Sequence, residues 1–404
     1  MHRQFLYFIV FSSLYFVLPS CSSYMTDQQD FFSKFQRKQF KQAADLIKDK
    51  SEKEGKDQIL FLLDRGTALF EDGDYKGAID VFTKAEKLTE VKDYTSISEE
   101  AVSVVTTDKY KKFYPLDYEL IMINVYLALS YYMEGKYDDA VVECRRINNL
   151  VYKLKAKGMK TFEESPFAWY LSASIYEIQK KYDDARIDYN RVMELAPSFK
   201  QAIYDTYRTA RYSGDLNQAR ELEKDNPELD LRNYYKGLCK KCGDVVVIYS
   251  AGMIPIKRPS RSNDMLPEFY TRTYNVSNLS IMDKDGVNLA TTSEISNLEA
   301  VARKNLSERV GMIVAKRILG IGTQVAIGYG VGKATHNEAI GVLAGLLVHA
   351  TAQPDTRGWS TLPKDFQIAR IRLPYGTQEL MLGGQRTIVD VPEAGGKLLF
   401  FRDF

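Results

Sequence analysis

Histidine is the scarcest ionisable residue of this 404-residue chain, with copies only at His2, His336 and His349. No His-Glu-x-x-His sequence joins two of them, so the zinc-protease motif is excluded. The spacings Gly-x-Ser-x-Gly and Ser-x-x-Lys, which are typical of serine nucleophiles, are lacking as well. We therefore expect no catalytic residue, no cofactor and no metal, and we interpret His349 as a packed, neutral imidazole.

Cysteine is almost as rare, and its four copies exclude a disulfide-rich scaffold. Cys144 occupies a helix-packing position of a repeat described below and is predicted to be a small core residue. Cys239 and Cys242 either form a disulfide or act as a redox couple. The pair precedes a predicted strand instead of opening a helix after one, which disfavours redox activity, and too few further ligands remain for structural zinc.

Neither a charge of one sign nor a long apolar run stands out. The 55 Lys and Arg nearly balance the 53 Asp and Glu, so no nucleic-acid surface is indicated. The glycine-rich stretch 320–345 contains Lys333 and Glu338, which argues against a transmembrane span. We expect close helix packing there, with a mobile or membrane-contacting segment as the alternative. The stretch 328–333 lacks the spacing of a phosphate-binding loop.

Residues 1–20 have the three parts of a secretory signal peptide: a basic start, an apolar stretch and a small residue before Cys21. The site resembles a bacterial lipobox, which implies cleavage before Cys21 and a lipid on its thiol. An ordinary signal peptide is the alternative. We expect residues 21–30 to be a polar tether, and two or three acyl chains, palmitate among them, to give permanent membrane attachment. Ser22, directly after the cysteine, favours attachment of the lipid to the outer membrane, with the protein facing the periplasm.

Small and aromatic residues recur over residues 61–92 at the spacing of two packed helices. Small residues allow the helices to approach closely, a glycine permits the turn between them, and aromatic rings fill the remaining wedge. The residues are Gly66, Leu69, Gly73, Tyr75, Ala78, Phe82 and Ala85. This is the pattern of a tetratricopeptide repeat (TPR).

The pattern returns along the first half of the chain. A second unit has Ala128, Tyr131, Gly135, Tyr137, Ala140 and Cys144, and a third has Trp169, Ala173, Tyr176, Tyr182, Ala185, Tyr189 and Pro197. Partial units surround Phe40 and Gly214. Residues 31–237 are therefore predicted to be an α-helical TPR-like solenoid, with insertions near 90–119 and 153–163. Such an array favours a protein partner, and we expect no small-molecule ligand.

The helical period ends near residue 237, and residues 238–404 are predicted to form an α+β domain with an antiparallel sheet. A helix is expected over 293–319, with Ser296 as its cap. Strands are expected at 244–249, 269–276, 278–282, 366–373, 378–382, 386–391 and 397–401, the last four as a meander.

A polar loop that contains Asp355, Arg357 and Trp359 precedes these last strands. It is either a recognition site or an internal clasp, in which Asp355 and Arg357 fix the loop while Trp359 fills the core. We favour the clasp.

Several further segments accompany the lipobox and the interrupted repeats, namely 117–119, 126–129, 142–146, 300–303, 355–363 and 370–376. Together they resemble a largely uncharacterised family of bacterial TPR-containing lipoproteins. The resemblance implies a role in the cell envelope and no catalytic residues. Gene neighbours of that family encode lipoproteins that activate peptidoglycan synthases, which implies a link to peptidoglycan synthesis.

The sequence thus favours a non-enzymatic scaffold that is attached to a membrane and binds envelope proteins. Two alternatives stay open. One is a protein that binds cell-wall glycan through exposed aromatic residues. The other is an enzyme whose polar site is assembled in three dimensions from residues such as Glu338, Asp355 and Arg357.

Overall fold

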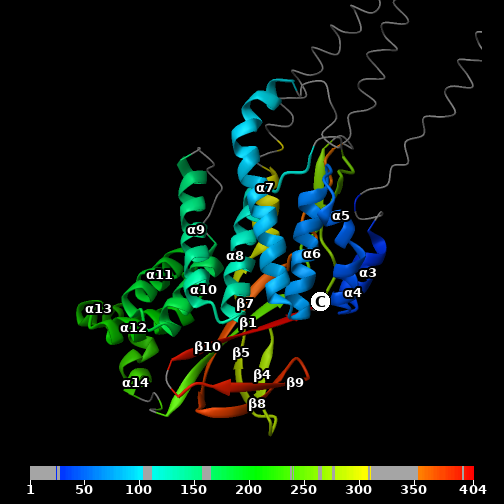
Figure 1. Cartoon of the computed structure of the whole chain (residues 1–404). Coiled ribbons are helices and arrows are strands. Elements are labelled where there is room, and N and C mark those ends of the chain that lie inside the picture. The colour runs from blue at the N-terminus through cyan, green and yellow to red at the C-terminus, as the bar shows by residue number, and fades with distance from the viewer. Residues whose placement is uncertain are drawn as a thin grey trace, which may run out of the picture.

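Helices make up the first half of the chain and strands most of the second (Figure 1). The computed structural model describes residues 24, 28–102, 112–156, 165–236, 239, 241–262, 266–274, 278–307, 310, 354–393 and 395–404. The predictions for residues 1–20, Cys21, the histidines, Glu338 and the stretch 320–345 lie outside these ranges. Within them, none of the helices is long and apolar enough to span a bilayer.

The helical half consists of paired helices in series, as the repeat pattern predicts. Its elements are α3 (Gln29–Gln36), α4 (Phe40–Leu46), α5 (Lys48–Glu52), α6 (Gln58–Asp72), α7 (Tyr75–Val102), α8 (Asp117–Met133), α9 (Tyr137–Ala156), α10 (Pro166–Ile178), α11 (Tyr182–Leu195), α12 (Gln201–Ser213), α13 (Leu216–Asp225), the 3₁₀ turn η2 (Pro227–Leu229) and α14 (Leu231–Lys236). The insertion expected near 90–119 begins as a continuation of α7.

The turn residue of each pair adopts the left-handed conformation that the repeat requires. Gly73, Gly135 and Gly214 have φ of 85°, 73° and 86°. The equivalent positions of two other units carry Lys38 and Lys180, with φ of 59° and 60°. The Cβ atom of lysine is sterically strained in this conformation, and glycine has no Cβ atom.

The small residue of the first unit sets how closely its two helices pack. A Cβ atom placed on Gly66 of α6 would lie 2.6 Å from the Phe82 ring of α7, which is closer than real contacts allow. Phe82 is fully buried and stacks on Tyr126 of α8, with 5.4 Å between ring centroids. The predicted role of this glycine and aromatic pair is therefore confirmed.

The strands within the described ranges form two four-stranded sheets and a short hairpin. They are β1 (Cys242–Ala251), β2 (Ile256–Pro259), β3 (Pro267–Tyr270), β4 (Ser280–Asp283), β5 (Asn288–Thr291), β6 (Ser293–Asn297), β7 (Asp365–Pro374), β8 (Gly376–Leu382), β9 (Gln385–Val391) and β10 (Gly396–Asp403). The first sheet has the order β10-β1-β7-β6 and the second β5-β4-β8-β9, while β2 pairs with β3.

The predicted antiparallel character is correct for most pairs, but the predicted meander of the last four strands is wrong. β7 pairs with β1 across the middle of the first sheet, β8 and β9 belong to the second sheet, and β10 runs parallel to β1. The reason is burial: β1 is buried along its whole length and needs a neighbouring strand on each edge.

The expected helix over 293–319 is also corrected at its start. Ser293–Asn297 form strand β6, which pairs with β7, and the helix begins at residue 298. Asn297, not Ser296, caps it, because its side-chain oxygen accepts a 2.9 Å hydrogen bond from the backbone N–H of Ala300. Residues 293–297 form a strand in spite of their helix-like spacing, because they hydrogen-bond to the free edge of β7.

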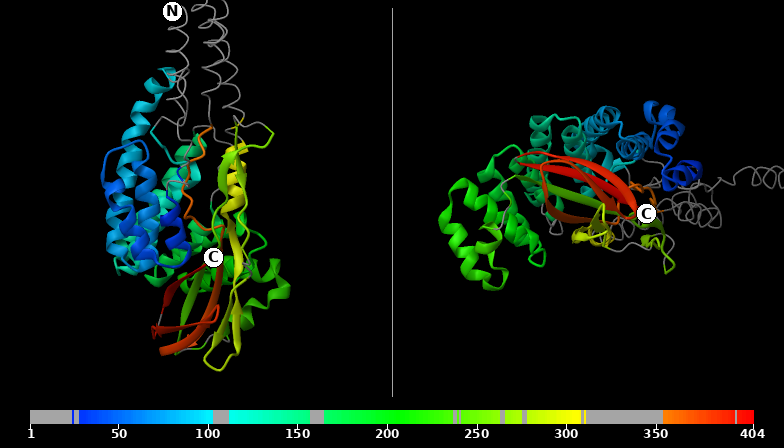
Figure 2. Two further views of the ribbon diagram at one scale, coloured as in Figure 1. Left: turned by 90° about the vertical axis from the view of Figure 1, so that its right-hand side faces the viewer. Right: turned by 90° about the horizontal axis from the view of Figure 1, so that it is seen from below.

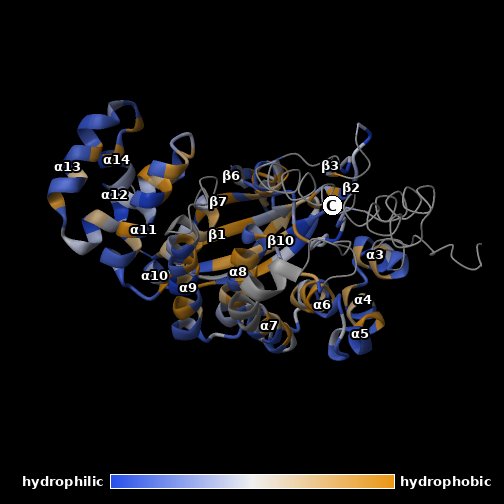
Figure 3. Ribbon diagram, turned by 90° about the horizontal axis from the view of Figure 1, so that it is seen from above, coloured by the Kyte–Doolittle hydropathy of each residue, from blue (hydrophilic) through white to orange (hydrophobic). Residues whose placement is uncertain are grey.

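The molecule has three layers: the helices, the first sheet and the second sheet (Figures 1 and 2). One face of the first sheet packs on the helices through Val246, Ile248, Phe366 and Ile368. The opposite face packs on the second sheet through a separate cluster that includes Val245 and Val247. Figure 3 shows β1, β7 and β10 as largely hydrophobic strands beside the helices. Both halves of the chain therefore share one core.

The inner helices α6, α8, α10 and α12 all contact the first sheet or its flanking loop. Phe167 of α10 stacks on Phe366 of β7 with 3.8 Å between centroids. The Tyr132 hydroxyl oxygen of α8 accepts a 2.9 Å hydrogen bond from the backbone N–H of Leu398 in β10. Arg402 of β10 forms a 3.0 Å ion pair with Glu71 of α6. The array is thus covered by its own sheet along the inner helices.

The folded body begins before the end of the expected tether at residues 21–30. Tyr24 is buried and its hydroxyl donates a 2.9 Å hydrogen bond to Asp64 of α6. Phe31 and Phe32 of α3 are buried in the main core. Of the predicted tether, Tyr24 is thus packed on the folded body, while Phe31 and Phe32 belong to the predicted repeat region that follows.

Replacement of Lys180 by glycine is expected to stabilise the protein. Lys180→Gly removes the steric cost of the left-handed conformation and should raise the free energy of unfolding by about 0.5–1 kcal/mol. Lys180 is exposed, so little packing is lost. Urea denaturation measures the change. As the matched control, Lys84→Gly in the exposed middle of α7 should lower it by about 1 kcal/mol. A loss of stability in Lys180→Gly would contradict the turn argument.

Candidate functional site

The loop before β7 lies against the inner helices of the first two full repeats. Trp359 is 1% exposed and contacts the rings of Phe82 and Tyr126 at centroid distances of 5.7 and 5.6 Å. Its indole N–H donates a 2.9 Å hydrogen bond to the Thr67 hydroxyl. Its backbone N–H donates a 2.7 Å hydrogen bond to Glu119 of α8. Trp359 therefore fills the core between helices.

Asp355 and Arg357 hold the same loop in place. The Arg357 guanidinium donates to both oxygens of Asp355 at 2.9 and 2.6 Å, and to Asp57 at 2.6 Å. Burial raises the pKa of Asp355, but its hydrogen bonds with Arg357 outweigh this and lower the pKa. The three predicted loop residues thus act on the array of the same molecule, in the arrangement of an internal clasp.

A buried carboxylate connects this loop to the start of the folded body. Asp64 accepts a 2.7 Å hydrogen bond from the Thr361 hydroxyl and a 2.9 Å bond from the Tyr24 hydroxyl. Burial raises the pKa of Asp64 to about 7, although both hydrogen bonds act to lower it. Asp64 therefore gains its charge near neutral pH.

At the other end of the array, buried charges join the inner helices to the first sheet. Arg208 of α12 forms ion pairs with Glu177 of α10 and with Asp205, both at 2.8 Å. Arg370 of β7 reaches the same two carboxylates at 2.8 and 3.2 Å. It also approaches Asp244 of β1 at 3.4 Å. We call these five residues the junction cluster.

The junction cluster is almost closed to solvent, and Arg208 has no exposed side-chain surface. Burial acts to raise the pKa of Glu177, but Arg208 and Arg370 outweigh it and hold the pKa at about 2. The tyrosine hydroxyls of Tyr170 and Tyr189 donate further hydrogen bonds to Asp205 and Glu177, at 2.7 and 2.9 Å. Glu177 is therefore charged, and hydrogen bonds and ion pairs satisfy both carboxylates almost fully.

A cavity of about 550 Å³ opens beside the junction cluster, between the end of the array and the first sheet. Three tyrosines and two cations come from the helices: Tyr182, Tyr212, Tyr235, Arg211 and Lys236. The sheet side contributes Asp244, Arg370, Arg372, Glu393 and the Cys239–Cys242 pair. A second cavity of about 380 Å³ shares Asp244, Arg370 and Arg372 with the first. We call the larger cavity the junction cleft.

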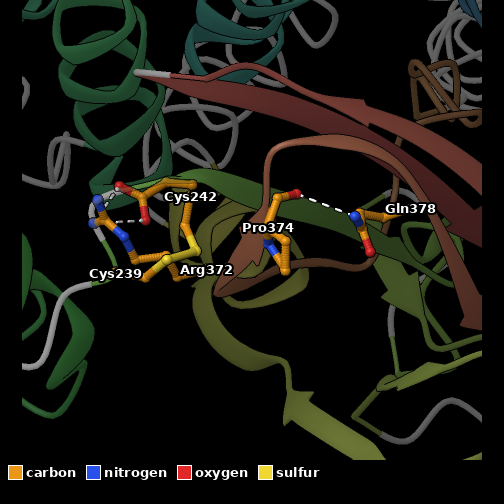
Figure 4. Close-up of a disulfide and its surroundings, with 6 residues drawn as sticks. Cys239, Cys242, Arg372, Pro374 and Gln378 are labelled. Carbon is orange, nitrogen blue, oxygen red and sulfur yellow. Dashed lines mark hydrogen bonds and ion pairs between the residues drawn. A yellow bond between two sulfur atoms is a disulfide. The ribbon is translucent and has the colours of Figure 1, made fainter.

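Cys239 and Cys242 form a disulfide that connects the end of the helical half to β1. Figure 4 shows the disulfide beside Arg372. Both cysteines and Arg372 line the junction cleft. Of the two alternatives predicted for this pair, a disulfide or a redox couple, the structure contains the disulfide. Cys144 is a buried free thiol whose pKa is raised by burial, as expected of a core residue.

Metal ligands do not gather within the described ranges, where no group of three or more His, Cys, Asp or Glu residues is placed to hold an ion. Sequence reasoning missed the junction cluster. One signal was available: Arg370 is in phase with Phe366 and Ile368 on the strand face that packs on helices. A charge in phase with a buried face requires a buried partner.

Comparison with known proteins agrees with the helical half. Residues 168–199, which cover α10 and α11, match the tetratricopeptide repeat model. No curated protein matches the sequence. Similar solved structures include a MamA RS-1 variant, at 16% identity, with 51% of this chain and 93% of that chain covered and a TM-score of 0.35. BtubC from P. vanneervenii is similar at 12% identity, covering 53% and 78%, with a TM-score of 0.33.

These findings make the chain a TPR-containing protein whose helical repeats precede a region with antiparallel sheets.

Removal of Arg370 is expected to be severe. Arg370→Met leaves three carboxylates of the junction cluster with Arg208 as their one buried cation, and should lower the free energy of unfolding by about 3–5 kcal/mol. Urea denaturation at pH 7 measures it. In the control Arg386→Met, which breaks an exposed ion pair with Glu379, the loss should stay below about 1 kcal/mol. Equal losses in the two variants would refute the assignment.

The ionisation of Asp64 gives a pH-dependent prediction. Its folded-state pKa of about 7 lies above the unfolded value, so its contribution to stability is complete below about pH 4 and is lost as pH rises through 7. Asp64→Asn removes this loss. Relative to the wild type, the variant should gain about 1–3 kcal/mol in unfolding free energy between pH 5 and pH 8. Exposed Asp80→Asn serves as the control and should show no such gain.

Proposed function

We propose that this protein is a lipid-anchored scaffold of the bacterial cell envelope that binds protein partners on the periplasmic side of a membrane, the outer membrane being favoured. We further propose that this role is linked to peptidoglycan synthesis and that the protein itself catalyses no reaction. The observation that carries it is a lipobox-type sequence at Cys21 directly before a TPR-containing body that starts at Tyr24.

The short spacing between these two residues has a geometric consequence. Tyr24 follows Cys21 by three positions and is packed against Phe32 and Phe61, at centroid distances of 6.3 and 5.2 Å. Three extended residues reach about 10 Å at most. A lipid on Cys21 would therefore hold the folded body directly at the bilayer surface, instead of at the end of a long tether.

The arrangement of the layers restricts where partners bind. In the described part of the chain, the sheet and the Trp359 loop contact the inner helices, so residues of the same chain occupy that side of the array. The junction cleft and the outer helices remain for partners. Exposed apolar side chains on the outer helices include Val142, Tyr152 and Ile187.

The test of this proposal compares the wild type with Cys21→Ala in a bacterial host. A palmitate analogue should label the wild type alone, and the wild type should sediment with membranes while Cys21→Ala is released. Both variants should retain the same thermal melting curve, because Cys21 precedes the packed residues.

Partner binding is measured in the same cells by crosslinking in the envelope fraction. Proteins captured by the wild type and lost with Cys21→Ala would be partners that require the anchor. A labelled Cys21→Ala protein, or a wild type that carries no lipid and stays soluble, would refute the anchor. A wild type that captures no protein above the level of an unrelated lipoprotein would refute the scaffold role.

A further inference from the structure

The junction cleft differs from the rest of the surface in how its charges are paired. Glu177 lies at its inner end and is already bound by Arg208 and Arg370, at 2.8 Å each. Its pKa of about 2 agrees with a carboxylate whose charge is fully compensated. The negative charge of Glu177 is therefore not available to a ligand that enters the cleft.

Arg372 is a cation of the cleft with unused hydrogen-bonding capacity. Its contacts in the described part of the chain are two long ones to Asp244, at 3.4 and 3.5 Å, and its buried Nε atom has no partner. The side chain is 23% exposed and lines both cavities. A guanidinium in this state can donate further hydrogen bonds to a carboxylate that enters the cleft.

Two more cations face the same space from the helices. Arg211 stacks over the ring of Tyr235 at 5.1 Å, and Lys236 ends α14. Both are exposed lining residues of the cleft, and Arg211 also acts on Glu223 of α13, whose pKa it helps to lower. The opposing charge at the rim is Glu393, which is also exposed. Over the whole lining, four cations (Arg211, Lys236, Arg370 and Arg372) face three carboxylates (Glu177, Asp244 and Glu393).

The remaining wall is aromatic. Tyr182 and Tyr212 lie with ring centroids 4.9 Å apart, and Tyr212 lies 5.8 Å from Tyr235. The Cys239–Cys242 disulfide and the backbone of Gly395 and Gly396 complete the lining. Tyrosine rings beside arginine and lysine suit a peptide with carboxylate side chains and a carbon backbone that packs on the rings.

We propose that the junction cleft binds an acidic segment of a protein partner, with its carboxylates on Arg372, Arg211 and Lys236 and its chain across the three tyrosines. This deepens the proposed scaffold function, and it rests on that function for the existence of a protein partner. The clasp and the anchor are not needed for the binding step itself.

The probe is a fluorescein-labelled peptide of glutamates with a free carboxyl terminus, and the reference is an amidated glutamine peptide of equal length. Fluorescence anisotropy is measured with the full chain in detergent. We expect saturable binding of the acidic probe alone, weakened by added salt. No saturable binding, or equal binding of both peptides, would overturn the proposal.

Substitutions then locate the site. Arg372→Gln should weaken probe binding about tenfold, as loss of a charge-assisted contact does. The double variant R211Q/K236Q should act in the same direction without touching the core, because both residues are exposed. Glu393→Gln should strengthen binding, since it removes the opposing charge at the rim. The matched control R220Q/K224Q, on exposed positions of α13, should leave binding unchanged.

Thermal melting of each variant separates a lost contact from a lost fold. If the cleft variants bind the probe as the wild type does, or if R220Q/K224Q weakens binding equally, the cleft is not the site. If inorganic phosphate displaces the probe more strongly than acetate does, the assignment to carboxylates is wrong. Because the probe is added to purified protein, failure here leaves the tests of the lipid anchor and of partner capture independent.

Discussion

Charges buried between two layers must find partners across the boundary, and this requirement fixes how the sheet sits on the helices. Arg370 of β7 enters a pocket of carboxylates supplied by α10, α12 and β1. Any shift of the sheet would leave Glu177 or Asp205 with too little compensation in a site closed to water. Hydrophobic burial holds the layers together, while the junction cluster selects one docking position among many.

That docking changes what the repeats are free to do. A solenoid normally offers its inner helices to a partner, but here Phe366, Leu398 and Trp359 occupy them. The chain acts as its own ligand along most of the array. What remains is the edge where the last helices leave the sheet, and the junction cleft lies at that edge. Its walls come from both halves of the chain, so it exists only in the docked arrangement.

Prediction from sequence was most successful where one residue type has one structural role. Gly66 and Phe82 correctly predicted that two helices pack closely. Gly73, Gly135 and Gly214 correctly predicted the turns between paired helices. Strand Asp244–Tyr249 was recognisable as a β-branched run. The meander and the start of the helix near residue 293 were wrong, because strand partners depend on which edges are left open and local periodicity contains no such information.

The sequence by itself determined the repeat units, the strands after residue 365 and the rarity of catalytic motifs, because these follow from local spacing and residue chemistry. Only the tertiary structure decided that Trp359 enters its own array, that Arg370 joins Glu177 across 193 positions, and that Arg372 retains free donors beside a cleft. Pairing between distant charges depends on how the layers stack. That stacking is set by the summed burial of both halves, which no short stretch of sequence contains.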